Sequence, residues 1–567
     1  MSSDISQLIQ LAQSADNNER NNAETTLLHA CDSDASSVLS ALMAVGVNAT
    51  NDQPLTSRQF ALLTARKLIT FYWSPAFESY RNTSSLNEQC KEFIRESLLK
   101  LCLDPEQDKK ISNGASYCIV QIAAVDFPDQ WPRLLEQLYA GIINTHSLNA
   151  MSVLNEIYDD VISEEMFFEG GIGMETLKII FQLLTNPNSS LDAKTAAMKL
   201  FNASLLQMST VTSHANHERK TFVQDVVPKS LETLLQLLQT YVNVFDQSAL
   251  QLKSKIYENL ALIKNDFPKK LFPHQAVVAF KQQSISDLAL LKDWSVNQNQ
   301  ENESLWQIFN ETTIQTLEFL SSVSTHASFT QEENIAILQS MLTLSCLDNA
   351  TRESWIDDPN EFVSKETGLT ASYTMRDQVA EYLGNLSGKT LQPTFENILE
   401  FININMSNNN TNLMESALYM LQSVLIQDDD EGLKIVSVPD FEKFIDTIFN
   451  YQLQTNDVTL SMRIILTVPK ILDIFMSVLP DIKGMLKNYL SKSIELAINI
   501  MNQENDKLIM SSVLIAFTYY AYFAELPSVL GNELCLQVQS NLLKIVNHVA
   551  EDAEEDTNGL LIEVLNN

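Results

Sequence analysis

The sequence predicts an all-α fold in which helical hairpins stack into an α-solenoid, and three observations support that prediction. Glycine is scarce, at 13 of 567 residues, against a usual share of roughly 7%, so few tight turns or phosphate-binding loops are expected. Apolar residues recur at helical spacing along most of the chain. A proline-containing turn returns several times, which indicates an internal repeat.

In chain order, the first helices break around residues 16–18. The hydrophobic period and the turn residues then predict helices over residues 35–47, 54–73, 87–103, 147–162, 174–184 and 191–208. The apolar run at 513–524 predicts a buried helix that is too short to span a bilayer.

Residues 117–139 show one hairpin in detail. The first half is apolar on nearly all sides, as in a buried helix. We expect Pro128 to end that helix, Asp129 to cap the next one through its carboxylate, and Pro132 to occupy the first turn. The second helix carries one apolar stripe, formed by Trp131, Leu134, Leu135, Leu138 and Ile142. Such a hairpin needs neighbours to bury its surface.

The repeat is marked by turns in which an apolar residue, a proline and a polar residue precede a new helix. Residues 126–128 and 266–268 both read Asp-Phe-Pro. The period of this pattern matches the roughly 40–47 residues of two-helix HEAT or armadillo units, so the chain would hold roughly 12–14 repeats. Pro469 is out of phase and is expected to kink a helix. The turn prolines are Pro128, Pro228, Pro268, Pro439, Pro480 and Pro527.

Net charge, cysteine pattern and absent motifs limit the classes of function that the chain can have. The net charge is −34, which disfavours direct binding of nucleic acid and suits basic partners, although solubility alone also explains an acidic surface. The six cysteines form no Cys-x-x-Cys pair and predict reduced core thiols, hence a cytosolic or nuclear protein. We find no signal peptide, metal-site spacing, nucleotide-binding loop or catalytic motif, so we expect no cofactor, no membrane insertion and no enzymatic activity.

Acidic side chains are the main candidates for partner contacts. Glu88, Glu92 and Glu96 share one helix face, because residues four apart are neighbours on a helix. Residues 156–160 contain the carboxylates Glu156, Asp159 and Asp160, and residues 428–431 read Asp-Asp-Asp-Glu. Solvated helix faces and loops are the alternative interpretation for each of these sets.

Several segments resemble one protein family. Residues 122–132, Ile-Ala-Ala-Val-Asp-Phe-Pro-Asp-Gln-Trp-Pro, are similar to the third repeat of the importin-β (karyopherin-β) family of nuclear transport receptors. Residues 23–27 and 58–73 resemble the first two repeats, and residues 358–380 resemble a later segment. The resemblance implies one continuous solenoid over residues 1–567, with N-terminal repeats at 4–73, further repeats at 74–210 and central repeats at 211–567. The apolar end at 559–565 leads us to expect a fragment of a longer receptor.

The resemblance also implies partners. Receptors of this family bind basic cargo, contact FG-repeat nucleoporins, shuttle between cytoplasm and nucleus, and release cargo on binding GTP-bound Ran. Residues 147–173 and 361–376 are most similar to members that carry histones and TATA-binding protein. Ran would lie against inner helices at about 35–47, 87–103 and 130–143. The resemblance identifies helices rather than contact residues; on them we expect Glu92, Glu96 and Glu136 to contact Ran, and we expect the acidic loop to contact cargo or Ran through Asp428, Asp429, Asp430 and Glu431. A HEAT-repeat scaffold or adaptor without a transport role is the alternative.

Overall fold

The computed structural model confirms the all-α prediction, because the residues it describes form helices and no strand. Two compact units divide the chain, Met1–Pro273 and His274–Asn567, and the expectation of one continuous solenoid stays a prediction. No described helix is long and apolar enough to cross a membrane. The described residues are 2–48, 54–211, 216–297, 302–324, 329–368, 373–386, 390–425, 438–452, 457–475, 479, 481–503, 506–523 and 526–567.

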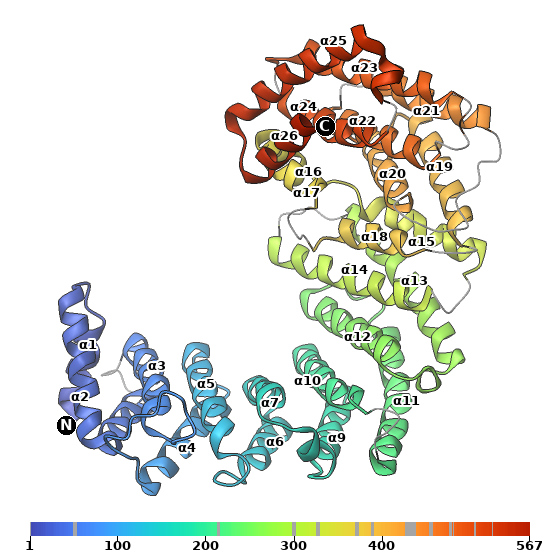
Figure 1. The fold of residues 1–567 in the computed structure, drawn as a ribbon. Coiled ribbons are helices and arrows are strands. Elements are labelled where there is room, and N and C mark those ends of the chain that lie inside the picture. Colours follow the sequence, from blue (N-terminus) through green and yellow to red (C-terminus); the bar gives the residue numbers. More distant parts are fainter. Residues whose placement is uncertain are drawn as a thin grey trace. The chain divides into compact units, whose positions relative to one another are not determined.

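The first unit is a two-layered stack of helices (Figure 1). Its elements are α1 (Ser2–Ala12), α2 (Asn17–Val47), α3 (Leu55–Tyr72), α4 (Glu88–Leu103), α5 (Lys109–Asp126), α6 (Leu134–Thr145), α7 (Leu148–Asp160), α8 (Glu164–Phe168), α9 (Ile172–Thr185), α10 (Leu191–Ser209), α11 (His217–Thr240), α12 (Gln247–Asp266) and η1 (Lys269–Leu271). Helices α3, α5, α7, α10 and α12 contact one another in that order and form what we call the second layer. Helices α4, α6, α9 and α11 alternate with them along the chain and form the first layer.

The second unit repeats this arrangement. Its elements are α13 (His274–Asn297), α14 (Glu303–Ser324), α15 (Gln331–Leu344), α16 (Asn349–Asp357), α17 (Pro359–Glu366), α18 (Met375–Gly384), α19 (Leu391–Ser407), α20 (Thr411–Val424), α21 (Val438–Gln452), α22 (Val458–Ile474), α23 (Ile482–Ile500), α24 (Asp506–Ala521), α25 (Leu526–Val549), η3 (Ala550–Asp552) and α26 (Glu555–Asn566). Helices α14, α18, α20, α22 and α24 contact one another in turn and form its second layer.

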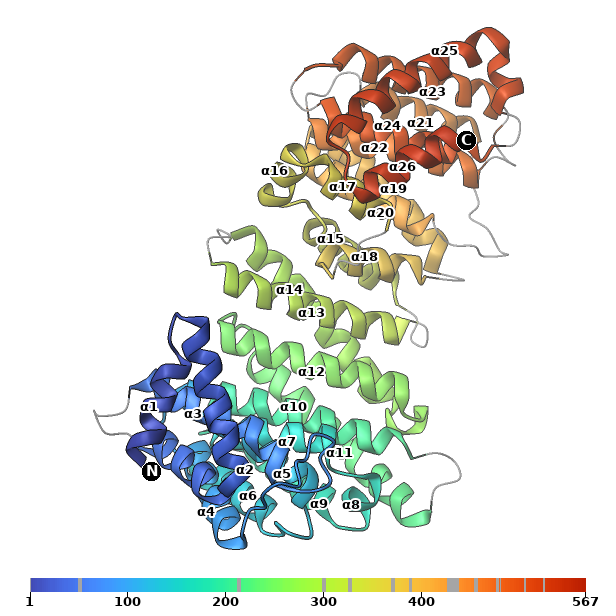
Figure 2. The same ribbon diagram turned by 60° about the vertical axis from the view of Figure 1, so that its left-hand side comes forward.

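One contact in the second unit departs from neighbour-to-neighbour stacking. Helix α17 packs against α24 and α26, which lie far along the chain (Figure 1, Figure 2). The Asn360 side-chain amide donates to the Asp552 carbonyl oxygen at 3.1 Å. The Asn360 side-chain oxygen accepts from the Glu554 backbone N–H at 3.1 Å and from the Thr557 hydroxyl at 2.6 Å. One asparagine therefore joins two segments that are about 190 residues apart in sequence.

Polar side chains cap many of the described helices. Asn87, Ser147 and Ser190 cap α4, α7 and α10, because their side-chain oxygens accept from backbone N–H groups of the first turn. The break predicted before residue 35 is present as non-helical backbone at Asp34, inside α2. These ends confirm the helices predicted over residues 35–47, 87–103, 147–162 and 191–208, to within one or two residues at most ends.

Basic side chains cap the C-terminal ends of two helices, α2 and α9. These contacts were not predicted from the sequence. Arg58 of α3 donates to the Gly46 carbonyl oxygen at the end of α2 at 3.0 Å. Lys194 of α10 donates to the carbonyl oxygens of Leu183 and Leu184 at the end of α9. A cation at a helix C-terminus satisfies free carbonyl groups and opposes the helix dipole. These basic residues therefore join the two helices of a hairpin.

The proline turns are partly confirmed. Helices α5 and α12 both end at the aspartate of an Asp-Phe-Pro turn, as the repeat predicted. Pro439 and Pro527 lie in the first turns of α21 and α25, Pro469 lies inside α22, and Pro480 lies outside the described residues.

The prediction at Pro228 is wrong, because this residue lies inside α11. The buried residues Val223, Val227, Leu231 and Leu234 continue one stripe on both sides of it. Packing along that stripe outweighs the roughly 3 kcal/mol that an internal proline costs.

The prediction that Asp129 caps the helix after Pro128 is also wrong. Helix α6 begins at Leu134, its N-cap residue is Arg133, and no side chain caps it. The backbone N–H groups of Gln130 and Trp131 instead return to the Asp126 carbonyl oxygen, at 2.7 and 3.0 Å. The turn is thus closed by backbone hydrogen bonds, and Pro132 precedes the helix.

A buried charge anchors this hairpin to its neighbours. The Asp126 carboxylate accepts from Arg95 at 2.5 Å and from the Trp73 indole N–H at 3.0 Å. The Arg95 guanidinium also lies over the rings of Trp73 and Trp131, 5.5 and 5.8 Å from their centroids. Trp131 is buried, as predicted. Helices α3, α4 and α5 and the following turn therefore meet at one carboxylate.

Replacing Asp126 with alanine should destabilise the first unit strongly. The change leaves the buried Arg95 guanidinium with only its 3.5 Å contact to the exposed Glu92 carboxylate, and breaking a buried pair typically costs about 3–5 kcal/mol. Urea unfolding measures the loss, and hydrogen exchange of peptides from α3 to α5 locates it. As a control, Glu136→Gln removes an exposed pair with Arg133 and should cost less than about 1 kcal/mol. Equal effects of the two changes would contradict the anchoring role.

Candidate protein-binding surfaces

The three glutamates predicted to contact Ran are exposed and lie in the first layer of the first unit. Glu92 and Glu96 are on α4, and Glu136 is on α6. Glu92 pairs with Arg95 at 3.5 Å, and Glu136 pairs with Arg133 at 3.2 Å. Two of the three carboxylates are thus partly neutralised within the chain, and their contact with Ran stays a prediction.

The second predicted acidic site, Asp428, Asp429, Asp430 and Glu431, lies outside the described residues. Helix α20 ends shortly before it, at Val424. Within the described ranges, no group of three or more His, Cys, Asp or Glu side chains is arranged to hold a metal ion.

A third acidic cluster lies in the second layer of the first unit, near the C-terminus of α7. Its members are Glu156, which is half-buried, and the exposed Asp159 and Asp160. Burial, followed by the charge of Asp160, raises the pKa of Glu156 above its ordinary value, although Arg66 opposes this shift. Burial and Asp160 also raise the pKa of Asp159.

This α7 cluster is not explained by helix stability. Carboxylates at a helix C-terminus face the negative end of the helix dipole, which disfavours them. Their mutual repulsion would be relieved by a cation placed beside them. The α7 cluster is therefore suited to bind basic side chains of a partner.

Exposed apolar side chains lie on helices of the same layer. Leu63 on α3, Tyr117 on α5 and Leu206 on α10 are each more than two-fifths exposed. The Arg66 guanidinium lies over the Tyr117 ring, 5.0 Å from its centroid. A mixture of apolar, aromatic and charged groups is typical of surfaces that bind proteins.

The second unit contains a buried network of two arginines and two glutamates. Arg463 on α22 donates to Glu415 on α20 at 2.9 Å and to Glu366 on α17 at 2.6 Å. Arg376 on α18 donates to Glu415 at 2.5 Å. The side chains of Arg463 and Glu415 are fully buried. The network joins α17 to three helices of the second layer.

The network keeps its charges at neutral pH. Burial alone would raise the pKa of Glu366, but Arg463 lowers it to about 2. The pKa of Glu415 is lowered as well, because Arg376 and Arg463 outweigh its burial. Burial would lower the pKa of Arg463, yet the two glutamates raise it above the ordinary value. Each charge is thus held by its partners.

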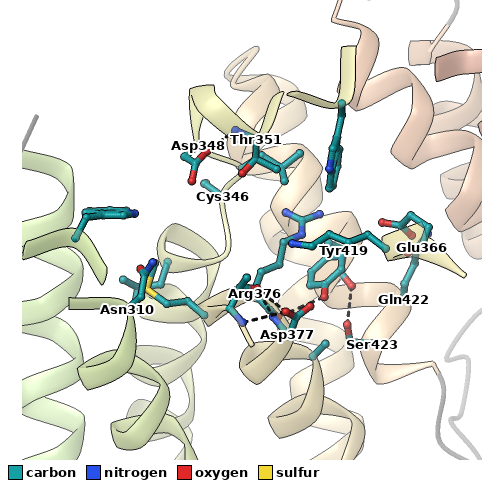
Figure 3. Close-up of a pocket in the computed structure, with 18 of the residues that line it drawn as sticks. Asn310, Cys346, Asp348, Thr351, Glu366, Arg376, Asp377, Tyr419, Gln422 and Ser423 are labelled. Carbon is teal, nitrogen blue, oxygen red and sulfur yellow. Dashed lines mark hydrogen bonds between the residues drawn. The ribbon is translucent and has the colours of Figure 1, made fainter. Parts of the chain in front are cut away.

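A pocket of about 230 Å³ lies beside this network. It is lined by residues of α14, the connection between α15 and α16, and helices α16, α17, α18, α20 and α22. Figure 3 shows Asp348 and Glu366 on opposite sides of the pocket, with Arg376 and Tyr419 between them. The Tyr419 ring lies 3.7 Å from the Arg376 guanidinium carbon. The pocket therefore combines aromatic walls with charged groups.

Sequence reasoning missed both the network and the pocket. Arg463 and Glu415 each stand alone within an apolar helical run, at residues 460–466 and 413–418. A lone charge in a buried run is costly unless it is paired, so the pattern indicates buried pairing. It does not identify the partners, which lie on other helices.

The stabilising effect of Glu366 should depend on pH. Its pKa is lower in the folded protein than its ordinary value of 4.5, so its contribution is complete above that value and is lost as the pH falls towards about 2. We expect Glu366→Gln to reduce the free energy of unfolding at pH 7, and the difference from the original protein to shrink below pH 5.

Urea unfolding at several pH values, with hydrogen exchange of peptides from α22, measures this difference. Glu381→Gln, at an exposed position on α18, is the control and should follow the original protein at every pH. A constant difference between Glu366→Gln and the original protein would rule out the expected linkage.

Comparison with known proteins agrees with this architecture. A family model described as importin-beta N-terminal domain matches residues 23–104, and one described as importin-9 central HEAT repeats matches residues 330–566. Kap121p solved bound to Ste12p has a TM-score of 0.57 at 16% identity, covering 98% of this chain and 52% of that one. Kap121p bound to RanGTP has a TM-score of 0.50 at 15% identity, covering 99% and 56%. These structures share the fold.

Curated relatives extend the comparison to sequence. Importin-9 of Drosophila melanogaster is 23% identical, over 63% of this chain and 36% of the relative. Importin subunit beta-5 of Saccharomyces cerevisiae is 49% identical over 572 residues, covering 99% of this chain and 55% of the relative. The chain thus spans about half the length of that relative. With importin models at both ends and a relative of nearly half identity along its whole length, the chain belongs to the importin-β family.

Proposed function

We propose that this chain acts as a nuclear import receptor that binds basic cargo, such as histones or TATA-binding protein, and is regulated by GTP-bound Ran. The observation that carries this proposal is the 49% identity to importin subunit beta-5 over 99% of the chain. Kap121p, which has the same fold, has been solved with Ste12p and with RanGTP. Both the relative's name and these complexes support transport over a scaffold role.

Charge supports a basic partner. The chain carries 71 acidic against 37 basic residues, which would steer basic proteins towards it at low salt. The α7 cluster supplies a local site, since Glu156, Asp159 and Asp160 lack enough cations of their own. We propose that this cluster contacts basic side chains of cargo or Ran.

Movement through the nuclear pore is part of the proposal. FG-repeat nucleoporins present phenylalanine side chains, which need apolar contacts on the receptor. Phe93 on α4, Ile143 on α6 and Met174 on α9 are exposed apolar side chains of the first layer. They support FG-repeat binding on the first layer, and shuttling between cytoplasm and nucleus.

Binding of Ran should depend on its nucleotide. We expect the immobilised chain to retain Ran loaded with a non-hydrolysable GTP analogue at least tenfold better than Ran loaded with GDP. Quantitative pull-down measures the ratio, and circular dichroism confirms that the sample is folded. Equal or absent binding by a folded sample would instead favour a HEAT-repeat scaffold.

Neutralising the α7 cluster should weaken binding of basic cargo. The triple change Glu156→Gln, Asp159→Asn and Asp160→Asn removes three exposed or half-exposed charges. At about 0.5 kcal/mol for each contact, the loss is about 1.5 kcal/mol, or roughly tenfold in affinity. Fluorescence anisotropy with labelled histones at several salt concentrations measures the loss and the expected decrease in salt dependence.

The matched control removes the same number of charges from the first layer, through Glu92→Gln, Glu96→Gln and Glu136→Gln. It should leave histone affinity within about twofold, and titration with GTP-bound Ran tests the predicted Ran contacts in the same sample. Equal loss of histone binding in both triple variants would show that total charge, rather than the α7 cluster, determines affinity.

A further inference from the structure

We propose that the pocket of the second unit is a binding site for an anionic side chain, carboxylate or phosphate, presented by a segment of a partner protein. The proposal does not depend on the transport function, because basic cargo would need the opposite charge. The proposal rests on the contacts that the carboxylates and the lysines of the pocket make within the chain.

The carboxylates that line the pocket are already satisfied. Glu366 is held by the two terminal nitrogens of Arg463, at 3.1 and 2.6 Å. Asp348 accepts from the Thr351 backbone N–H at 2.6 Å and caps α16. Asp377 accepts from the backbone N–H and the hydroxyl of Thr374 in the capping box of α18. The carboxylates that line the pocket are therefore already hydrogen-bonded within the chain.

The lysines that line the same pocket form no close ion pair with a carboxylate among the described residues. Lys365 on α17 and Lys470 on α22 both line it and are both half-buried. The Lys470 ammonium lies over the Tyr519 ring at 4.9 Å, and its charge helps to hold the pKa of Glu366 low, after the larger effect of Arg463. Two ammonium groups thus share one pocket in a chain of net charge −34.

The size and walls of the pocket fit a short segment. A volume of about 230 Å³ is below the roughly 300–1,000 Å³ of sites for drug-sized molecules, so it holds one side chain and its adjoining backbone. Trp306, Trp355 and Tyr419 supply flat apolar walls for the non-polar part of that side chain. The half-buried setting strengthens the attraction of an anion to the lysines relative to water. A phosphate, with a charge of about −1.5 to −2, matches two lysines more fully than one carboxylate does.

The network holds this pocket open in one shape. Arg376 lines the pocket and is fixed by Glu415 and by the Ser345 carbonyl oxygen, at 2.7 Å. Gln422, on the opposite side, accepts from Arg463 at 2.8 Å. Because these groups are fixed before any ligand arrives, binding requires little reorganisation.

The test uses the chain of residues 1–567 and three fluorescent peptides of the same length, with a central glutamate pair, phosphoserine or lysine pair. We expect saturable anisotropy binding for the glutamate or phosphoserine peptide, none for the lysine peptide, and competition by the unlabelled anionic peptide. A higher affinity for phosphoserine identifies phosphate as the preferred group, and a higher affinity for glutamate identifies carboxylate.

The double variant Lys365→Gln, Lys470→Gln should weaken that binding at least tenfold. The matched control Lys443→Gln, Lys487→Gln removes the same charge from exposed positions on α21 and α23 and should change affinity less than twofold. Thermal unfolding checks that each variant folds, and Lys470→Gln alone replaces the double variant if that one does not. Absence of saturable binding, binding of inorganic phosphate alone, or equal losses in both double variants would overturn the proposal.

Discussion

Buried arginine–carboxylate pairs set the register of both units. Apolar packing between helices is favourable but not directional, so it permits small slips of one helix along another. A slip that separates Arg463 from Glu415, or Arg95 from Asp126, leaves an uncompensated buried charge, which costs several kcal/mol. Each pair joins two different helices. The positions of the second-layer helices, and so of the surfaces they carry, depend on these few charges.

Some of the chain's positive charges are buried, so its net charge understates how acidic its surface is. Arg58 and Lys194 are buried cations whose partners are backbone carbonyl or amide oxygens rather than carboxylates. Such positive charges are used inside the fold, and the carboxylates that would balance them remain at the surface. The surface available to partners is therefore more acidic than a count of all residues indicates.

The sequence predicted what is local and missed what depends on tertiary contacts. Helix starts at Asn87 and Ser147 and the matching ends of α5 and α12 follow from residues within one turn, and they are confirmed. Pro228 was misassigned because tertiary packing along α11 overrides a local preference. The α7 carboxylates were visible as a cluster, but their layer and the raised pKa values of Glu156 and Asp159 depend on the neighbouring helices. The partners of Arg463 lie 48 and 97 residues away, where no periodic pattern identifies them.

The contact between α17 and α26 has a mechanical consequence for the second unit. A stack that touches only its neighbours behaves like a spring, in which bending accumulates freely and segments unfold one after another. Asn360 bonds to residues 552–557 and closes the intervening chain into a loop. Any change of curvature there must either break those three hydrogen bonds or be shared by all the enclosed helices at once. Stretching the segment from α17 to α26 therefore requires that these hydrogen bonds break first.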